Sequence, residues 1–158
     1  MPAVSFAEAL AVAVRIEENG IAFYEEASRQ SADPSAMDVF RKLAAMEKEH
    51  RSFFLELAKT ADDLESRFAN DPQNSFAGTL SAMADGAVFD AEAGTFTGKE
   101  RPGEAVRAAI ALEKDSIIFY LGLKSAMAES KERIRIDGII CEEMRHISIL
   151  HELLKKQR

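Results

Sequence analysis

The sequence predicts an all-α protein: one four-helix bundle made of two antiparallel hairpins that a long crossover joins. Apolar residues recur at helical spacing in four stretches, and no stretch alternates polar and apolar residues as a half-buried strand would. Proline suits the first turn of a helix and breaks its interior, and all four prolines fall where helices should begin or end. With 158 residues, the chain is expected to form a single domain over 1–158.

The first hairpin is predicted from helices over about 5–31 and about 35–61. Ser5 and Glu8 form a Ser-x-x-Glu capping box ahead of the first apolar-periodic run. The sequence Asp-Pro-Ser at 33–35 ends that run and supplies a cap for the next helix.

The second hairpin is predicted from helices over about 102–128 and about 131–156, which leaves a segment of some 40 residues, 62–101, between the hairpins. Connections between adjacent helices of a bundle need only about 2–8 residues. The segment is therefore expected to cross from one end of the bundle to the other, with a short helix around Phe76–Phe89.

Composition excludes several classes of protein. A formal net charge of −7 argues against binding to nucleic acid, whose phosphates would be repelled. The single cysteine, Cys141, permits no intrachain disulfide and no four-cysteine metal site. No segment reaches the ~18 uninterrupted apolar residues of a membrane span, and the N-terminus lacks the basic start of a signal peptide. We therefore expect a cytoplasmic protein.

The chain repeats itself at a single offset of 96 residues. The register passes through two helices and their turn without a gap, so both hairpins should share one geometry. Four pairs of residues that can carry chemistry coincide in this register: Glu17 with Glu113, Tyr24 with Tyr120, Glu47 with Glu143, and His50 with His146.

Each predicted helix carries one glutamate where its apolar stripe asks for a hydrophobic side chain. The two glutamates of each hairpin are 30 residues apart, which places them about 13–17 residues from the turn, or roughly 20–25 Å along each helix. All four should lie at one level. Each histidine follows its glutamate by three residues and so shares its face.

Four carboxylates in an apolar core would repel one another, and two divalent cations would supply +4 against −4. A lone Glu-x-x-His is more often a surface ion pair, but two copies in a fixed repeat favour a two-metal site. Carboxylate-rich ligands with two histidines favour iron or manganese over zinc. The predicted ligands are Glu17, Glu47, His50, Glu113, Glu143 and His146.

At these residues the sequence resembles the rubrerythrin-like branch of the ferritin-like superfamily. The likeness covers nearly the whole chain and is strongest in IEENGIAFYEEAS, LAAMEKEHRSFF, ALEKDSIIFYLGLK and EEMRHISILHELL. The resemblance implies that Glu47 and Glu143 bridge two metals. It further implies terminal ligands in pairs, Glu17 with His50 and Glu113 with His146. Tyr24 and Tyr120 are implied as hydrogen-bond donors to the carboxylates, and the alternative is that both are plain core aromatics.

Three departures from the family's pattern bear on function. Rubrerythrins proper carry a further glutamate three residues after the ligand of the third helix, and this position is Ser116. The two CxxC pairs of a rubredoxin-like domain are not in the sequence, so electrons are expected from a separate donor protein. The chain ends at Arg158, just after the fourth helix, without the short fifth helix of ferritin cages. A typical peroxidase and an iron-storage cage are both less favoured.

Three functions remain open. The first is a di-iron oxidoreductase, with two iron ions per site (manganese or zinc as substitutes), that reacts with O2 or peroxide. The second is a non-enzymatic protein that binds or handles iron, and the third is a bundle whose metal is purely structural. In each case we expect no membrane partner and a homo-oligomer, most simply a dimer.

Overall fold

The computed structural model describes residues 5–63 and 103–157. Four long helices make up this part of the chain: α1 (Phe6–Gln30), α2 (Pro34–Ala58), α5 (Glu104–Ser125) and α6 (Lys131–Lys156). The described residues contain no strand, so the predicted all-α bundle of two helical hairpins is confirmed. Residues 64–101 of the predicted crossover, with its short helix at Phe76–Phe89, lie outside the described residues.

The helices begin where side chains satisfy free backbone N–H groups. Ser5 accepts from Glu8 N at 3.1 Å, while the Glu8 carboxylate accepts from Ser5 N at 2.8 Å, so both halves of the capping box form. Asp33 accepts from Ser35 N at the start of α2. Ser130 accepts from Arg133 N at the start of α6.

Two helices are shorter than the sequence pattern indicates. Helix α5 starts only at Glu104, because Gly103 before it takes a left-handed backbone with φ of 84°. It ends at Ser125, although Ala126 and Met127 are still buried, so the apolar pattern outlasts the helix. Helix α2 ends at Ala58, where Lys59 N turns to Glu56 O in an i, i+3 bond.

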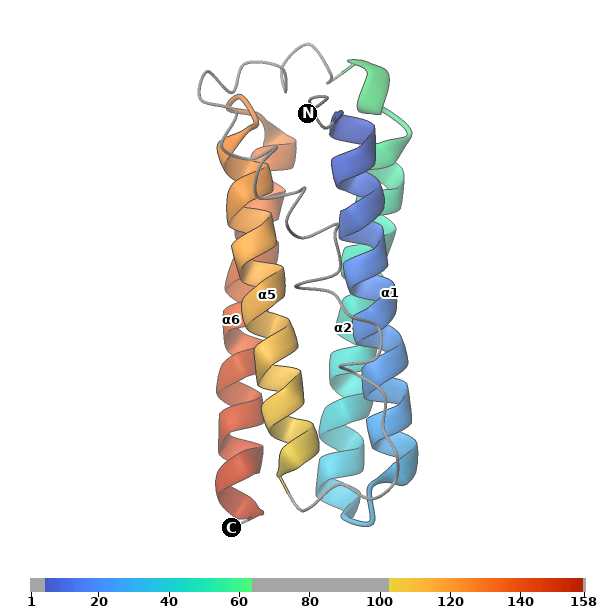
Figure 1. Cartoon of the computed structure of the whole chain (residues 1–158), viewed down its shortest axis with the longest axis vertical. Coiled ribbons are helices and arrows are strands. Elements are labelled where there is room, and N and C mark those ends of the chain that lie inside the picture. The colour runs from blue at the N-terminus through green and yellow to red at the C-terminus, as the bar shows by residue number, and fades with distance from the viewer. Residues whose placement is uncertain (1–4, 64–102, 158) are drawn as a thin grey trace.

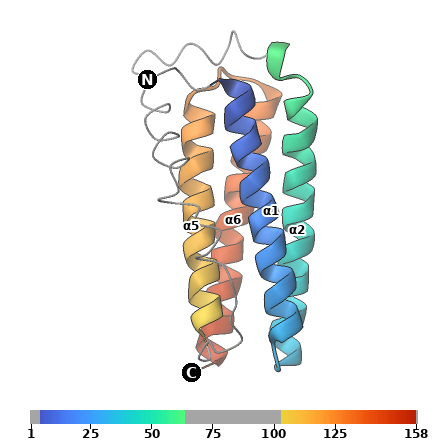
Figure 2. The same ribbon diagram turned by 45° about the vertical axis from the view of Figure 1, so that its right-hand side comes forward.

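The two hairpins, α1 with α2 and α5 with α6, lie side by side along the bundle (Figures 1 and 2). The N-terminal ends of α1 and α6 and the C-terminal ends of α2 and α5 lie at the same end. Among the described residues, no helix is both long enough and apolar enough to cross a membrane.

The core consists of two apolar clusters. One includes Phe6, Leu10 and Phe54 near one end of the bundle, and the other includes Phe40 and Leu153 toward the opposite end. A polar layer lies between them, midway along the helices. All buried glutamates and histidines of the described residues lie in this layer. They are the six predicted ligands: Glu17, Glu47, His50, Glu113, Glu143 and His146.

Candidate metal centre

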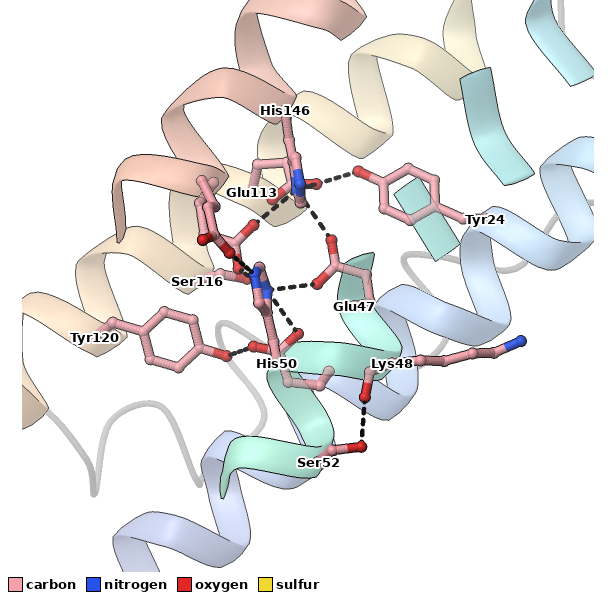
Figure 3. A network of polar contacts seen from close by, with 12 residues as sticks. Tyr24, Glu47, Lys48, His50, Ser52, Glu113, Ser116, Tyr120 and His146 are labelled. Carbon is pink, nitrogen blue, oxygen red and sulfur yellow. Dashed lines mark hydrogen bonds and ion pairs between the residues drawn. The ribbon is translucent and has the colours of Figure 1, made fainter. Parts of the chain in front are cut away.

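Each of the four helices contributes one carboxylate to the polar layer, and α2 and α6 add a histidine each (Figure 3). The glutamates are between 1% and 4% exposed, and both histidines are 0% exposed. The i, i+3 spacing within α2 and α6 places each histidine one turn from its glutamate on the same inward face. The structure thus brings together all six residues that the sequence singled out.

The residues divide into two overlapping groups. In the first, Glu17, Glu47, His50 and Glu143 each offer one ligand atom, and these atoms lie within 4.8 Å of one another. His50 Nδ1 is 3.1 Å from Glu143 Oε1 and 3.5 Å from Glu47 Oε2. The same nitrogen is 3.7 Å from Glu17 Oε2.

The second group consists of Glu47, Glu113, Glu143 and His146, again with its ligand atoms within 4.8 Å. His146 Nδ1 is 2.9 Å from Glu143 Oε2, 3.1 Å from Glu47 Oε1 and 3.3 Å from Glu113 Oε1. Glu47 and Glu143 belong to both groups, and each turns one oxygen toward each histidine. This is the arrangement that two carboxylates bridging a pair of ions require.

Most of the buried nitrogen and oxygen atoms of the cluster form no hydrogen bonds with one another, which leaves them available to bind cations. Seven buried atoms of the cluster have no hydrogen-bond partner within the described chain: Glu17 Oε2, Glu47 Oε1, His50 Nδ1, both oxygens of Glu143, and both ring nitrogens of His146. All of them except His146 Nε2 approach neighbouring charges at 2.9–3.7 Å, but without hydrogen-bond geometry. Leaving a buried polar atom unpaired costs about 1–3 kcal/mol. Six donor side chains of this chemistry suit two divalent ions.

Protons can balance the cluster before any metal binds. Burial raises the pKa of Glu17 and of Glu113 well above the usual carboxyl range, which favours the protonated, neutral form of both. Burial would also raise the pKa of Glu47 and Glu143, but the close contacts with His146 and His50 outweigh it, and both pKa values are lowered.

The two histidines carry the matching positive charges. Burial alone would lower the pKa of His146, but the carboxylates of Glu113, Glu143 and Glu47, 2.9–3.3 Å from its Nδ1, raise it to about 12. The pKa of His50 is raised in the same way by Glu143, Glu17 and Glu47, against the effect of burial. Two imidazolium ions then offset two carboxylates. The net charge of −4 that the sequence argument gave to the four glutamates therefore applies only when metal is bound.

Both tyrosines contact the cluster across the bundle. Tyr24 of α1 donates its hydroxyl hydrogen bond to Glu113 Oε1 of α5, and Tyr120 of α5 donates to Glu17 Oε1 of α1. Each ring is held by a stacked phenylalanine, Phe40 beside Tyr24 and Phe54 beside Tyr120. Each tyrosine thus contacts the carboxylate of the opposite hairpin, a pairing that the spacing within one helix does not reveal.

Sequence reasoning missed two residues on α6. Glu142 Oε2 lies 2.6 Å from His50 Nε2, on the side of the ring away from the cluster. Arg135 Nη1 lies 3.2 Å from Glu142 Oε1, and its guanidinium sits 5.8 Å from the centre of the Phe53 ring. Both residues are partly exposed, and so they look like ordinary solvated charges in the sequence. The repeat offered a signal, because it places Met46 opposite Glu142 and Val39 opposite Arg135.

Comparison with known proteins agrees with this geometry. A search of the curated proteins gave no match. A crystal structure from Thermotoga maritima, provisionally described as a ferritin-like diiron-carboxylate protein, superposes with a TM-score of 0.71 at 22% identity, covering 100% of this chain and 99% of the other. At that identity the likeness speaks for the fold. The rubrerythrin family model matches residues 8–154, nearly the whole chain. The chain therefore belongs to the rubrerythrin family, as its resemblance predicted.

Proposed function

We propose that this protein is a di-iron oxidoreductase that reacts with O2 or peroxide. The observation that carries the proposal is the pair of overlapping ligand groups that share Glu47 and Glu143. Glu17 and His50 complete one group, and Glu113 and His146 complete the other. Four carboxylates with only two imidazoles favour iron, with manganese as the nearest substitute and zinc as a weaker one.

The surrounding residues suit redox chemistry at such a centre. When bound, a pair of Fe(II) ions would supply two electrons to O2 or peroxide. Tyr24 and Tyr120 hold Glu113 and Glu17 by hydrogen bonds and so fix the direction of the terminal carboxylates. The apolar clusters on either side of the layer keep bulk water away from it.

The proposal includes a place and a set of partners for the protein. We infer that a separate electron-donor protein reduces the centre. A rubredoxin-like iron site needs four cysteines, and the sequence has one, Cys141. A reducing, cytoplasmic setting suits both this free thiol and Fe(II). We further propose a homodimer. Size-exclusion chromatography with light scattering tests that last point, and a mass near 17.4 kDa would contradict it.

The central experiment uses the protein loaded anaerobically with Fe(II) and then mixed with peroxide or air. We expect oxidation of two iron ions per chain, followed by repeated turnover when a chemical reductant is present. Glu143→Ala should abolish the fast reaction, because it removes a residue of both ligand groups. The matched control is Glu152→Ala, which removes an exposed glutamate of the same helix. Equal rates for Glu143→Ala and for the control would overturn the proposal.

Ser116 favours a second candidate function, which is iron binding without turnover. In rubrerythrins proper this position holds an additional glutamate, whereas the Ser116 hydroxyl donates to Leu112 O of its own helix at 3.0 Å. The cluster thus lacks that additional carboxylate. A single stoichiometric oxidation without further turnover in the same experiment would favour iron handling. If iron changed only the melting temperature, the metal would be structural.

A further inference from the structure

The internal repeat is broken at one place beside the candidate centre. His50 Nε2 lies 2.6 Å from Glu142 Oε2, and Arg135 holds the other oxygen of Glu142 at 3.2 Å. On the other side of the pseudo-twofold, His146 Nε2 is buried and has no hydrogen-bond partner within the described chain. The 96-residue offset pairs Glu142 with Met46, so the equivalent position on the His146 side has a thioether in place of a carboxylate.

This difference acts on the nitrogen that faces the cluster. When Glu142 accepts a hydrogen bond from His50 Nε2–H, the lone pair of His50 is fixed on Nδ1, which points toward the shared carboxylates. His146 must likewise present the lone pair of Nδ1 to bind an ion, and its buried Nε2–H then finds no acceptor among residues 5–63 and 103–157.

The remaining contacts of the two ligand groups follow one pattern, with carboxylate oxygens 3.1–3.7 Å from His50 Nδ1 and 2.9–3.3 Å from His146 Nδ1. Tyr24 donates to Glu113 just as Tyr120 donates to Glu17, so the tyrosines do not distinguish the groups. The repeat also differs at Gly20 and Ser116, but the Ser116 hydroxyl bonds within its own helix. Gly20 lies against the side chain of Glu47 but offers it no hydrogen bond. The carboxylate of Glu142 is therefore the difference that adds a hydrogen bond to a ligand.

We propose that the two metal positions are unequal, and that Glu142 is the positioning residue that makes the Glu17–His50 position bind its ion more tightly than the Glu113–His146 position. This inference rests on the proposed two-metal site. Hydrogen-bond partners behind a metal-binding histidine typically change metal affinity about 10–100-fold. We expect a difference of that size between the two positions.

Two ions that share carboxylates influence each other, so each position must be measured alone. Glu113→Gln leaves the Glu17–His50 position complete, and Glu17→Gln leaves the other. Calorimetric titration of each metal-free variant with Mn²⁺ under argon gives the affinity of a single position. We expect Glu113→Gln to bind about 10–100-fold more tightly than Glu17→Gln. Equal affinities would overturn the proposal.

Adding Glu142→Ala to each variant assigns the difference to its cause. The second substitution should weaken Mn²⁺ binding about 10–100-fold in the Glu113→Gln background and leave the Glu17→Gln background unchanged. Glu142→Gln, which keeps an acceptor oxygen, should restore part of the loss. Glu152→Ala is the matched control and should alter neither background. Equal weakening of both backgrounds would mean that Glu142 has only a structural role, and would refute the proposal.

A gain-of-function variant guards against loss of folding. Met46→Glu in the Glu17→Gln background places a carboxylate behind His146, and we expect Mn²⁺ binding to tighten about tenfold or more. An unchanged affinity would contradict the inference. If wild-type protein and all variants bind no Mn²⁺, the proposed metal centre itself fails. That outcome is distinct from two ions bound at positions of equal strength.

Discussion

The cluster's protonation makes a numerical prediction about metal loading. In the metal-free protein, raised pKa values favour the protonated form of four ligands: Glu17, Glu113, His50 and His146. Glu47 and Glu143 are ionised because their pKa values are lowered. Binding of two divalent ions needs all six ligands deprotonated. Loading should therefore release about four protons per two ions, a neutral exchange of charge.

The same exchange fixes how metal affinity depends on pH. With about two protons displaced by each ion, the apparent affinity per ion should rise roughly 100-fold for each unit of pH near neutrality. The assay is a titration with Mn²⁺ under argon in a weakly buffered solution that contains a pH indicator, with base added back to count the protons. Mn²⁺ avoids the protons that the oxidation of iron would add.

A matched variant makes the count more demanding. Glu113→Gln keeps one complete ligand group, so it should bind one ion and release about two protons, from Glu17 and His50. Release of less than one proton per ion from the wild-type protein would refute the reasoning. It would mean that the buried carboxylates and imidazoles are already deprotonated before metal arrives.

Three further predictions concern stability and geometry. Ser5→Ala removes the capping box of α1 and should lower the free energy of unfolding by about 0.5–2 kcal/mol in urea titrations, with an unchanged value counting against the cap. Metal-free protein should lose stability as pH rises from 6.5 to 8.5. The folded state favours keeping protons that unfolded carboxyl and imidazole groups release, on the four ligands with raised pKa values: Glu17, Glu113, His50 and His146. The slope should be about 1.4 kcal/mol per pH unit for each proton so retained, and a rise in stability would contradict the assigned charges. Tyr120→Phe removes the hydrogen bond to Glu17 and should weaken Mn²⁺ binding when tested with Glu113→Gln but not with Glu17→Gln, whereas equal weakening would indicate lost packing.

The fold was predictable because its signals are local and repeated. Ser5 with Glu8, and the Asp-Pro-Ser sequence at 33–35, mark helix starts through short-range hydrogen bonds that any reading of the sequence can find. The end of α5 was not predictable in this way. Ala126 and Met127 continue the buried pattern after the helix has ended at Ser125, so hydrophobic spacing alone gave an end three residues too late.

The six residues of the site could be found because each occupies a position that helical periodicity assigns to the core. The contacts behind them could not. The hydrogen bonds from Tyr24 to Glu113 and from Tyr120 to Glu17 join opposite hairpins, and sequence spacing describes one helix at a time. Glu142 is partly exposed, so no apolar pattern marks it.

The balance of charge also needed the structure. The sequence shows four glutamates and two histidines, but only the distances show that both histidines lie within 2.9–3.7 Å of carboxylate oxygens. At such distances the carboxylates raise the pKa values of both imidazoles and so favour imidazolium ions in the metal-free cluster. We therefore expect the metal ions to replace protons that already offset the negative charge of the carboxylates.

The central claim is that this chain holds two metal ions in one shared cluster, and a count of bound ions tests it most directly. Protein purified without added metal, then loaded with Fe(II) under argon and desalted, is analysed by mass spectrometry of its metals. The structure predicts two ions per wild-type chain, about one for Glu17→Gln or Glu113→Gln, and near zero for a variant that lacks both Glu47 and Glu143. A wild-type count below one, or a count that stays the same in all of these variants, would contradict the account.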